Sequence, residues 1–283
     1  MTSRSRFAKT LACLLASSAA VDAFAQAASP APAAPAEAPA YTLTGNVAVV
    51  SDYRFRGISQ SYRLPAVQAG FDFTHSSGFY FGNWNSSVSG NSYNNGASLE
   101  MDLYGGYRFD LAKDVNADVG LLFYVYPGAR LNQSPGVPSD KKYDNAELYA
   151  GVTSGPFNAK LSYAVTDYFG LNGETAGYAY FSSLPDRGNS KGTVYMELNY
   201  TLDLGDKLTL GAHAGHTVVR HYSELSYTDL KVSLNKEWAG LNFGAAVVGS
   251  NAKKDDYQVA NAGGLDAKRV GTTTLVLSVG KTF

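Results

Sequence analysis

Apolar and polar residues alternate along most of the chain from Thr42 to Phe283, in about twelve runs that each end in a cluster of turn residues. The clearest run covers residues 99–109. One face of this run carries Leu99, Met101, Leu103, Gly105, Tyr107 and Phe109, and the other carries Glu100, Asp102, Tyr104, Gly106 and Arg108. A repeat of two residues predicts β-strands with one apolar and one polar face.

The whole pattern predicts strands at residues 42–55, 65–75, 79–89, 98–109, 116–126, 145–152, 157–167, 192–202, 208–218, 227–237, 241–250 and 271–283. The connections between these strands alternate in length: those such as 76–78, 153–156 and 237–240 are short, whereas 127–144 and 168–191 are long. A soluble sandwich has no reason to make every second connection tight, but an outer-membrane barrel has short periplasmic turns and long outer loops. The sequence therefore predicts an all-β fold, a transmembrane antiparallel up-and-down β-barrel of about twelve strands.

The N-terminus indicates export. Basic residues precede an apolar stretch at residues 11–21 that contains Cys13, the only cysteine, and Ala23-Phe24-Ala25 is typical of a signal-peptidase site. We expect a signal peptide at residues 1–25, a Pro/Ala-rich periplasmic linker at 26–40 and the barrel at 41–283. The predicted cleavage changes the formal net charge from −1 to −3, which leaves no basic surface for nucleic acid.

Strand direction predicts where aromatic residues lie. An even number of strands places both termini in the periplasm, so the first strand runs outward. Tyr53 and Phe55 are then expected near an outer strand end. The periplasmic ends are predicted to carry Phe71, Phe73, Tyr107, Phe109, Phe157, Tyr200, Trp238 and Phe283. Such girdles occur where aromatic rings meet the headgroup layer.

The opening of the predicted barrel, Ser51-Asp52-Tyr53-Arg54-Phe55-Arg56-Gly57-Ile58-Ser59-Gln60, together with Gly70-Phe71-Asp72 and Ser77-Gly78-Phe79-Tyr80, resembles the TorF-like family of proteobacterial porins. The ending Lys281-Thr282-Phe283 is similar too, and a final Phe on an amphipathic strand resembles the assembly signal of outer-membrane proteins. The resemblance implies a porin-like barrel in the cell outer membrane and brings no assigned substrate or functional residues.

If the apolar faces contact lipid, the opposite faces line the interior. The predicted pore-lining residues are Asp52, Arg54, Arg56, Asp72, Glu100, Asp102, Tyr104, Arg108, Asp118, Tyr124, Glu147, Tyr149, Lys160, Tyr195, Glu197, His213, Asp229 and Lys231. Arg54 and Arg56 are expected to face Glu100, Asp102 and Glu147 across the outer half of the bore. This arrangement would orient a small polar or zwitterionic solute, and the acidic excess predicts a mild cation preference. The same charges would equally suit structural salt bridges that plug the bore.

Two other functions remain as alternatives, a sealed structural or adhesive barrel and an outer-membrane hydrolase. Against hydrolysis, His213 is expected to point inward, His216 toward lipid and His221 into a loop, so they share no face. We predict no enzyme activity, no metal and no cofactor. The expected partners are outer-membrane lipid, small polar solutes and the outer-membrane assembly machinery.

Overall fold

The computed structural model describes residues 39–283 apart from 94–95, 132–140, 179–180, 261–263 and 265. The predicted signal peptide and all but the last two residues of the predicted linker lie outside this range. Within it, the wall of the fold consists of β1 (Tyr41–Val50), β4 (Ala66–His75), β5 (Phe79–Ser87), β6 (Leu99–Ala112), β7 (Val115–Val125), β8 (Asn145–Ser154), β9 (Phe157–Ala164), β10 (Val194–Asp203), β11 (Leu208–Val218), β12 (Tyr227–Trp238), β13 (Leu241–Ser250) and β16 (Thr274–Thr282).

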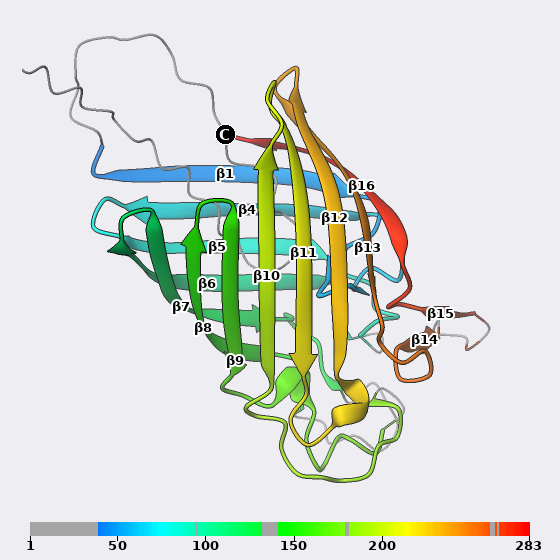
Figure 1. Cartoon of the computed structure of the whole chain (residues 1–283). Helices are drawn as coiled ribbons and strands as arrows, with labels where there is room; N and C mark the ends of the chain where they lie inside the picture. Colours follow the sequence, from blue (N-terminus) through cyan, green and yellow to red (C-terminus); the bar gives the residue numbers. More distant parts are fainter. Residues whose placement is uncertain (1–38, 94–95, 132–140, 179–180, 261–263, 265) are drawn as a thin grey trace, which may run out of the picture.

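Each of these strands pairs antiparallel with the next along the chain, and β16 returns to β1 with Val279 opposite Val49. The predicted all-β, twelve-stranded up-and-down barrel is confirmed. In Figure 1, β10–β12 on the near wall cross β1 and β4–β6 behind them at a steep angle. Tilted strands on opposite walls of a barrel give this appearance.

The two ends of the barrel differ. At one end the connections are short turns, such as residues 76–78 and 155–156, and the C-terminus lies there (Figure 1). At the other end lie the long loops and the small elements β2 (Arg54–Phe55), β3 (Ile58–Ser59), η2 (Tyr168–Gly170), η4 (Ser223–Leu225), β14 (Gln258–Ala260) and β15 (Ala267–Arg269). The alternation of connection lengths read from the sequence is therefore present in the structure.

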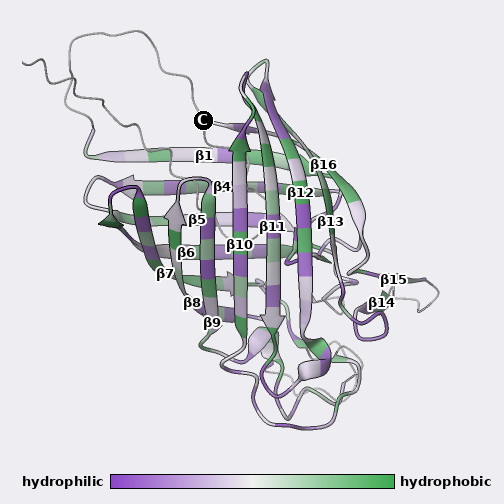
Figure 2. Ribbon diagram, viewed as in Figure 1, coloured by the Kyte–Doolittle hydropathy of each residue, from purple (hydrophilic) through white to green (hydrophobic). Residues whose placement is uncertain are grey.

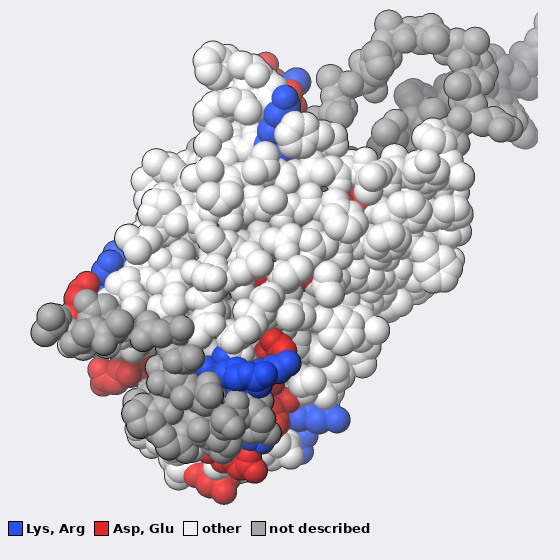
Figure 3. Space-filling view, turned by 180° about the vertical axis from the view of Figure 1, so that it is seen from behind, with Lys and Arg blue, Asp and Glu red and all other residues white. Residues whose placement is uncertain are grey.

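The outer surface of the wall is apolar. Leu198, Leu230, Val247 and Leu275 are each more than half exposed although they lie within strands. Along the strands hydrophobic and hydrophilic residues alternate (Figure 2). On the face seen in Figure 3, Lys, Arg, Asp and Glu gather at the two ends and the belt between them is almost free of charge. A contiguous apolar surface of this size is costly in water and favourable against acyl chains. No helix among the described residues has the length and apolarity to cross a membrane.

The largest difference from the sequence prediction concerns the first strand, expected at 42–55. The strand ends at Val50, and the chain turns into the barrel, so Tyr53 and Phe55 are 0% and 6% exposed. Their predicted position in an outer aromatic girdle is wrong. The girdle at the short-turn end is present: Tyr107, Phe109, Phe157, Trp238 and Phe283 are exposed there, and Phe73 and Tyr200 are half-buried. Phe71 is exposed but lies in the middle of β4, so its predicted place at the strand end is wrong.

The interior has two halves. An aromatic core, built largely from the loop-end segments of strands and from the long loops, fills the half near the long loops and includes Tyr53, Phe55, Tyr124, Tyr143 and Tyr222. Farther toward the short turns the inner wall carries ion pairs, amides and hydroxyls. A barrel of eight strands is filled by its own side chains and one of 16–18 strands leaves an open channel, and twelve strands lie between these limits.

Candidate functional site

All eighteen predicted pore-lining residues point to the interior of the barrel or lie within it. Twelve of them are buried: Asp52, Arg54, Arg56, Glu100, Asp102, Tyr104, Asp118, Tyr124, Glu147, Tyr195, Glu197 and Asp229. The other six are partly exposed toward the interior: Asp72, Arg108, Tyr149, Lys160, His213 and Lys231. Asp52, Arg54 and Arg56 do not lie on the wall, however, because they follow the end of β1 at Val50. We call residues 51–65 the inner hairpin.

The inner hairpin turns at Arg56 and Gly57, whose φ angles are 47° and 79°. Two successive positive φ values are typical of a type I′ turn, which joins two-residue strands such as β2 and β3. Glycine is required at the second position for a further reason, since an added Cβ would lie 2.7 Å from the Cβ of Asp229 on the wall. The turn is thus pressed against β12.

The base of the inner hairpin is fixed by a buried ion pair. Arg54 Nη2 lies 2.7 Å from Asp52 Oδ2, and Ser59 Oγ donates to the same carboxylate at 2.5 Å. The Arg54 guanidinium also donates to the carbonyls of Val270 and Thr272 at 2.8 and 3.0 Å. Burial lowers the pKa of this guanidinium from its ordinary value, and Asp52 opposes that shift. Arg54 therefore stabilises the inner hairpin and connects it to the segment before β16.

Arg56 ties the tip of the inner hairpin to the far wall. Its Nη2 and Nη1 donate to Glu147 Oε2 and Oε1 on β8 at 2.7 and 3.1 Å, and the guanidinium lies 4.1 Å from the centre of the Tyr195 ring. The two side chains are 1% and 3% exposed. β8 is five strands from β1 in one direction and seven in the other, so this bidentate pair spans the lumen.

This contact corrects one prediction. The sequence predicted a basic wall opposite an acidic wall, with room for a solute between them. In the structure Arg56 contacts Glu147 directly and Arg54 pairs with Asp52 on its own segment. The outer half of the lumen is bridged by the inner hairpin at this point.

Two buried carboxylates next to the inner hairpin have oxygens without hydrogen-bond partners among the described residues. Glu100 and Asp102, adjacent inward positions of β6, are 1% and 0% exposed. Tyr53 of the inner hairpin donates to Glu100 Oε1 at 3.0 Å, but Glu100 Oε2 and both oxygens of Asp102 have no hydrogen-bond partner among the described residues. Buried acidic oxygens without partners are costly, so this wall favours a positive charge or water beside it.

Farther toward the short turns the wall charges pair with one another. Lys160 Nζ lies 2.9 Å from Glu197 Oε1, and Arg108 Nε lies 3.6 Å from Asp118 Oδ2. Tyr80 donates to Asp118 at 2.6 Å and its ring lies 3.9 Å from the Arg108 guanidinium. The two ion pairs join neighbouring strands, β9 with β10 and β6 with β7, whereas the Tyr80 hydroxyl on β5 reaches Asp118 on β7 and the Tyr149 hydroxyl on β8.

Several tyrosine rings lie flat on inward glycines of a neighbouring strand. The Tyr104 ring covers Gly82 and the Tyr149 ring covers Gly120, where an added Cβ would stand 2.6 and 2.5 Å from ring atoms. Glycine lets the ring lie along the wall, so the hydroxyl reaches a neighbouring polar group: Tyr104 donates to Asp72 at 2.6 Å. The inward glycines therefore set the positions of the polar rings.

We expect Gly120→Ala to lower the free energy of unfolding by about 1–3 kcal/mol, because the methyl group would force the Tyr149 ring out of its position. Urea unfolding in detergent micelles, followed by heat-modifiable electrophoretic mobility, measures this change. Gly151→Ala is the matched control, since the added Cβ at this inward position of β8 would meet other atoms at 3.4 Å or more. Equal stability of the two variants would contradict the packing argument.

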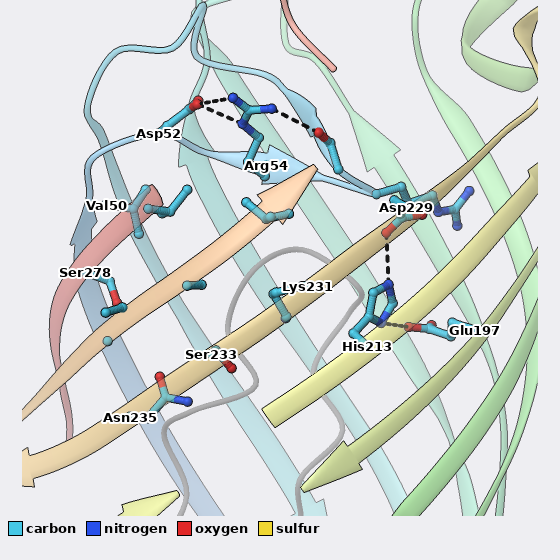
Figure 4. Close-up of a pocket in the computed structure, with 17 residues that line it drawn as sticks. Val50, Asp52, Arg54, Glu197, His213, Asp229, Lys231, Ser233, Asn235 and Ser278 are labelled. Carbon is cyan, nitrogen blue, oxygen red and sulfur yellow. Dashed lines mark hydrogen bonds and ion pairs between the residues drawn. The ribbon is translucent and has the colours of Figure 1, made fainter. Parts of the chain in front are cut away.

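A cavity of about 80 Å³ lies beside the inner hairpin against β10–β13 and β16 (Figure 4). Its lining carries acidic, basic and neutral polar groups, including Asp52, Arg54, Glu197, His213, Asp229, Lys231, Ser233, Asn235 and Ser278. A polar cavity of this size is large enough to hold water. The cavity is thus a polar space beside the inner hairpin.

His213 is held at the edge of this cavity between two strands (Figure 4). Its Nε2 lies 2.9 Å from Asp229 Oδ1 and its Nδ1 lies 2.6 Å from Asn199 Oδ1. The Tyr195 hydroxyl also lies 3.0 Å from Nε2, so both ring nitrogens have polar partners. Glu197 Oε2 is 3.7 Å from Nδ1 and adds to the acidic surroundings.

The three histidines of the hydrolase alternative do not come together. His213 faces the lumen, His216 is exposed on the outer face of β11 with its Nδ1 2.9 Å from Thr228 Oγ1, and His221 lies in the loop before η4. No group of three His, Cys, Asp or Glu side chains suited to a metal occurs in the part of the chain that the structure describes.

Sequence reasoning missed several interior residues. Tyr80 and Trp84 on β5 are buried, as is Gln68 on β4, yet only their polar neighbours entered the prediction. Both faces of β5 carry aromatic and polar residues, so alternation alone does not distinguish inside from outside there. The inward face of β5 is identified instead by the pairing of Trp84 with the inward residue Asp102 on β6.

The family model described as a bacterial protein of unknown function (Gcw_chp) matches residues 33–283. The chain belongs to this family. A comparison with curated proteins finds no significant match. The resemblance to TorF-like porins stays a prediction.

Solved structures similar to this Gcw_chp-family chain are outer-membrane porins. The KdgM porin in complex with disordered oligogalacturonate has a TM-score of 0.48 and 8% identity, covering 86% of this chain and 99% of that one. The NanC porin has a TM-score of 0.45 and 9% identity, covering 85% and 98%. OccK2 (OpdF) of Pseudomonas aeruginosa in complex with glucuronate has a TM-score of 0.37 and 15% identity, covering 88% and 68%.

Proposed function

We propose that the protein is a porin-like channel of the cell outer membrane through which small polar or zwitterionic solutes diffuse passively, with a mild preference for cations. The inner hairpin narrows the bore and the eighteen inward residues line it. The outward-facing belt contacts lipid, and insertion uses the outer-membrane assembly machinery after export directed by residues 1–25.

One observation carries this proposal: a closed barrel with an apolar exterior encloses ionisable groups of both signs, several of which line a cavity. Charges on the inside of a membrane barrel are costly unless they are paired or hydrated. Lys160, Arg108 and Arg56 are paired, whereas Asp102 leaves both oxygens without a partner among the described residues. A wetted lumen with a local acidic excess is the arrangement expected of a channel that passes small polar or cationic solutes.

A sealed structural barrel is the second candidate, and a specific observation favours it. The half of the lumen near the long loops is filled by the aromatic core, and the Arg56–Glu147 pair crosses it. The two candidates differ in one physical quantity, the free energy needed to displace the inner hairpin. A few kcal/mol would give a channel that opens often enough to conduct, and a much larger value would give a closed barrel.

Planar-bilayer recording of the purified protein tests the proposal. We expect discrete channel events from the wild type, and larger or more frequent events from Arg54→Ala plus Arg56→Ala, which removes both anchors of the inner hairpin. Liposome swelling with sugars, amino acids and quaternary amines then identifies the solute class. Silence of both proteins in bilayers, together with intact heat-modifiable folding, would favour the sealed barrel.

A further inference from the structure

The apolar belt is interrupted in the middle of β5. Asn83 is the central residue of this strand and Asn85 follows two positions later, and both are half-buried on the outward face because they alternate with the buried Trp84 and Ser86. Across from them on the outward faces of the neighbouring strands lie Phe71 and Ala69 on one side and Leu103 and Met101 on the other. We call Asn83 and Asn85 the amide patch.

Some of the hydrogen-bond donors and acceptors of the amide patch are satisfied within the barrel. Asn85 Nδ2 donates to Asn83 Oδ1 at 2.5 Å and to the carbonyl of Ala69 at 3.2 Å, and Asn83 Nδ2 donates to the carbonyl of Asp102 at 3.1 Å. Each amide has two N–H donors and one carbonyl acceptor. One N–H of Asn83 and the Oδ1 of Asn85 therefore have no partner among the described residues.

Acyl chains cannot supply these partners. Neither donors nor acceptors are present in the hydrocarbon layer, so polar side chains at its centre face protein or water instead. The surroundings of the patch allow another surface to approach, since Ala69 and Gly105 on the adjacent strands are small outward residues. Phe71, Phe81 and Leu103 border this shallow region with exposed apolar area.

We propose that the amide patch is the contact between two copies of this chain. The unpaired N–H of Asn83 is a donor and the unpaired Oδ1 of Asn85 is an acceptor, so the amide patch is complementary to a second copy of itself. Across a two-fold axis, the N–H of Asn83 in each copy meets the Oδ1 of Asn85 in the other. Isologous contacts of this kind are the commonest in homo-oligomers. The inference depends on the membrane location of the belt and is independent of whether the lumen conducts.

Disulfide cross-linking of full-length protein in isolated outer membranes tests the contact. Asn85→Cys is compared with Ala214→Cys, an exposed outward position of β11, which lies on the opposite side of the twelve-stranded ring from β5. The unsubstituted chain, whose only cysteine is Cys13, gives the background. We expect about tenfold more dimer from Asn85→Cys than from Ala214→Cys, the factor that corresponds to 1.4 kcal/mol.

A second variant separates pairing from folding. Asn83→Leu plus Asn85→Leu should lower the dimer association constant in detergent by about tenfold, since membrane hydrogen bonds contribute modestly and two symmetry-related pairs are lost. Heat-modifiable mobility of the monomer should stay unchanged. Equal cross-linking at positions 85 and 214, an unchanged association constant, or cross-linking of Asn85→Cys to a different protein would each overturn the proposal.

Discussion

Glu147→Gln is expected to release the inner hairpin and to raise the open probability of the channel by about a hundredfold or more. The substitution keeps the shape of the side chain but leaves the Arg56 guanidinium buried without its bidentate partner. Removing one partner of a buried ion pair costs about 3–5 kcal/mol. This cost applies only while the hairpin is docked, because water hydrates the guanidinium once the hairpin is displaced. The equilibrium constant between the docked and displaced hairpin therefore shifts toward displacement by two to three powers of ten, at about 1.4 kcal/mol for each.

Single-channel recording measures this shift directly, and Glu237→Gln provides the matched control. Glu237 pairs with Lys207 near the short turns, where the side chains are 26% and 49% exposed, and such exposed pairs contribute about 0–1 kcal/mol. We expect no change in open probability for Glu237→Gln. An unchanged open probability for Glu147→Gln would show that the Arg56–Glu147 pair does not hold the bore closed.

The double variant Arg56→Ala plus Glu147→Gln distinguishes two effects: the loss of the Arg56–Glu147 ion pair, and the burial of an unpaired Arg56 guanidinium. If the hairpin moves because Arg56 is left unpaired, removing Arg56 as well should restore part of the stability to urea while the channel stays active. The non-additive part of the two effects gives the coupling between these residues.

The wall of the barrel is well predicted from the sequence because alternation reports burial directly. In β6, Glu100, Asp102 and Tyr104 are buried, and Leu99 and Leu103 are exposed, as the period of two requires. Strand pairing follows from chain order in an up-and-down barrel, so the neighbours of each strand need no further information. This logic holds for strands whose two faces differ in polarity and fails for β5, whose two faces both carry aromatic and polar residues.

The inner hairpin could not be predicted in the same way. Asp52, Arg54 and Arg56 alternate with Tyr53 and Phe55 as a strand would, so the pattern gives no sign that the wall strand ends at Val50. Their placement depends on positive φ angles at residues 56–57 and on contacts with Glu147 and Val270, which are 91 and 216 residues away in sequence. Contacts of such long range are decided by the closed barrel, which the local sequence does not describe.

The acidic wall next to the hairpin raises a separate question of selectivity. Glu100 and Asp102 bring two carboxyl groups to one inward face of β6, and Tyr53 of the inner hairpin covers them. When the hairpin is docked, no solvent reaches these groups. When it is displaced, the carboxylates become part of the lining at the narrow part of the bore, so they should act on permeant ions mainly in the open state.

Glu100→Gln plus Asp102→Asn is therefore expected to lower the cation-to-anion permeability ratio of open channels by about tenfold. A unit charge about 10 Å from an ion contributes roughly 1.7 kcal/mol at an effective dielectric constant of about 20, and salt screening reduces the sum for two charges. Reversal potentials in a salt gradient measure the ratio. Asp206→Asn, which neutralises an exposed carboxylate in a short turn, is the control and should leave the reversal potential unchanged. A wild-type channel that prefers anions, or an unchanged ratio in the double variant, would show that these carboxylates do not set the selectivity.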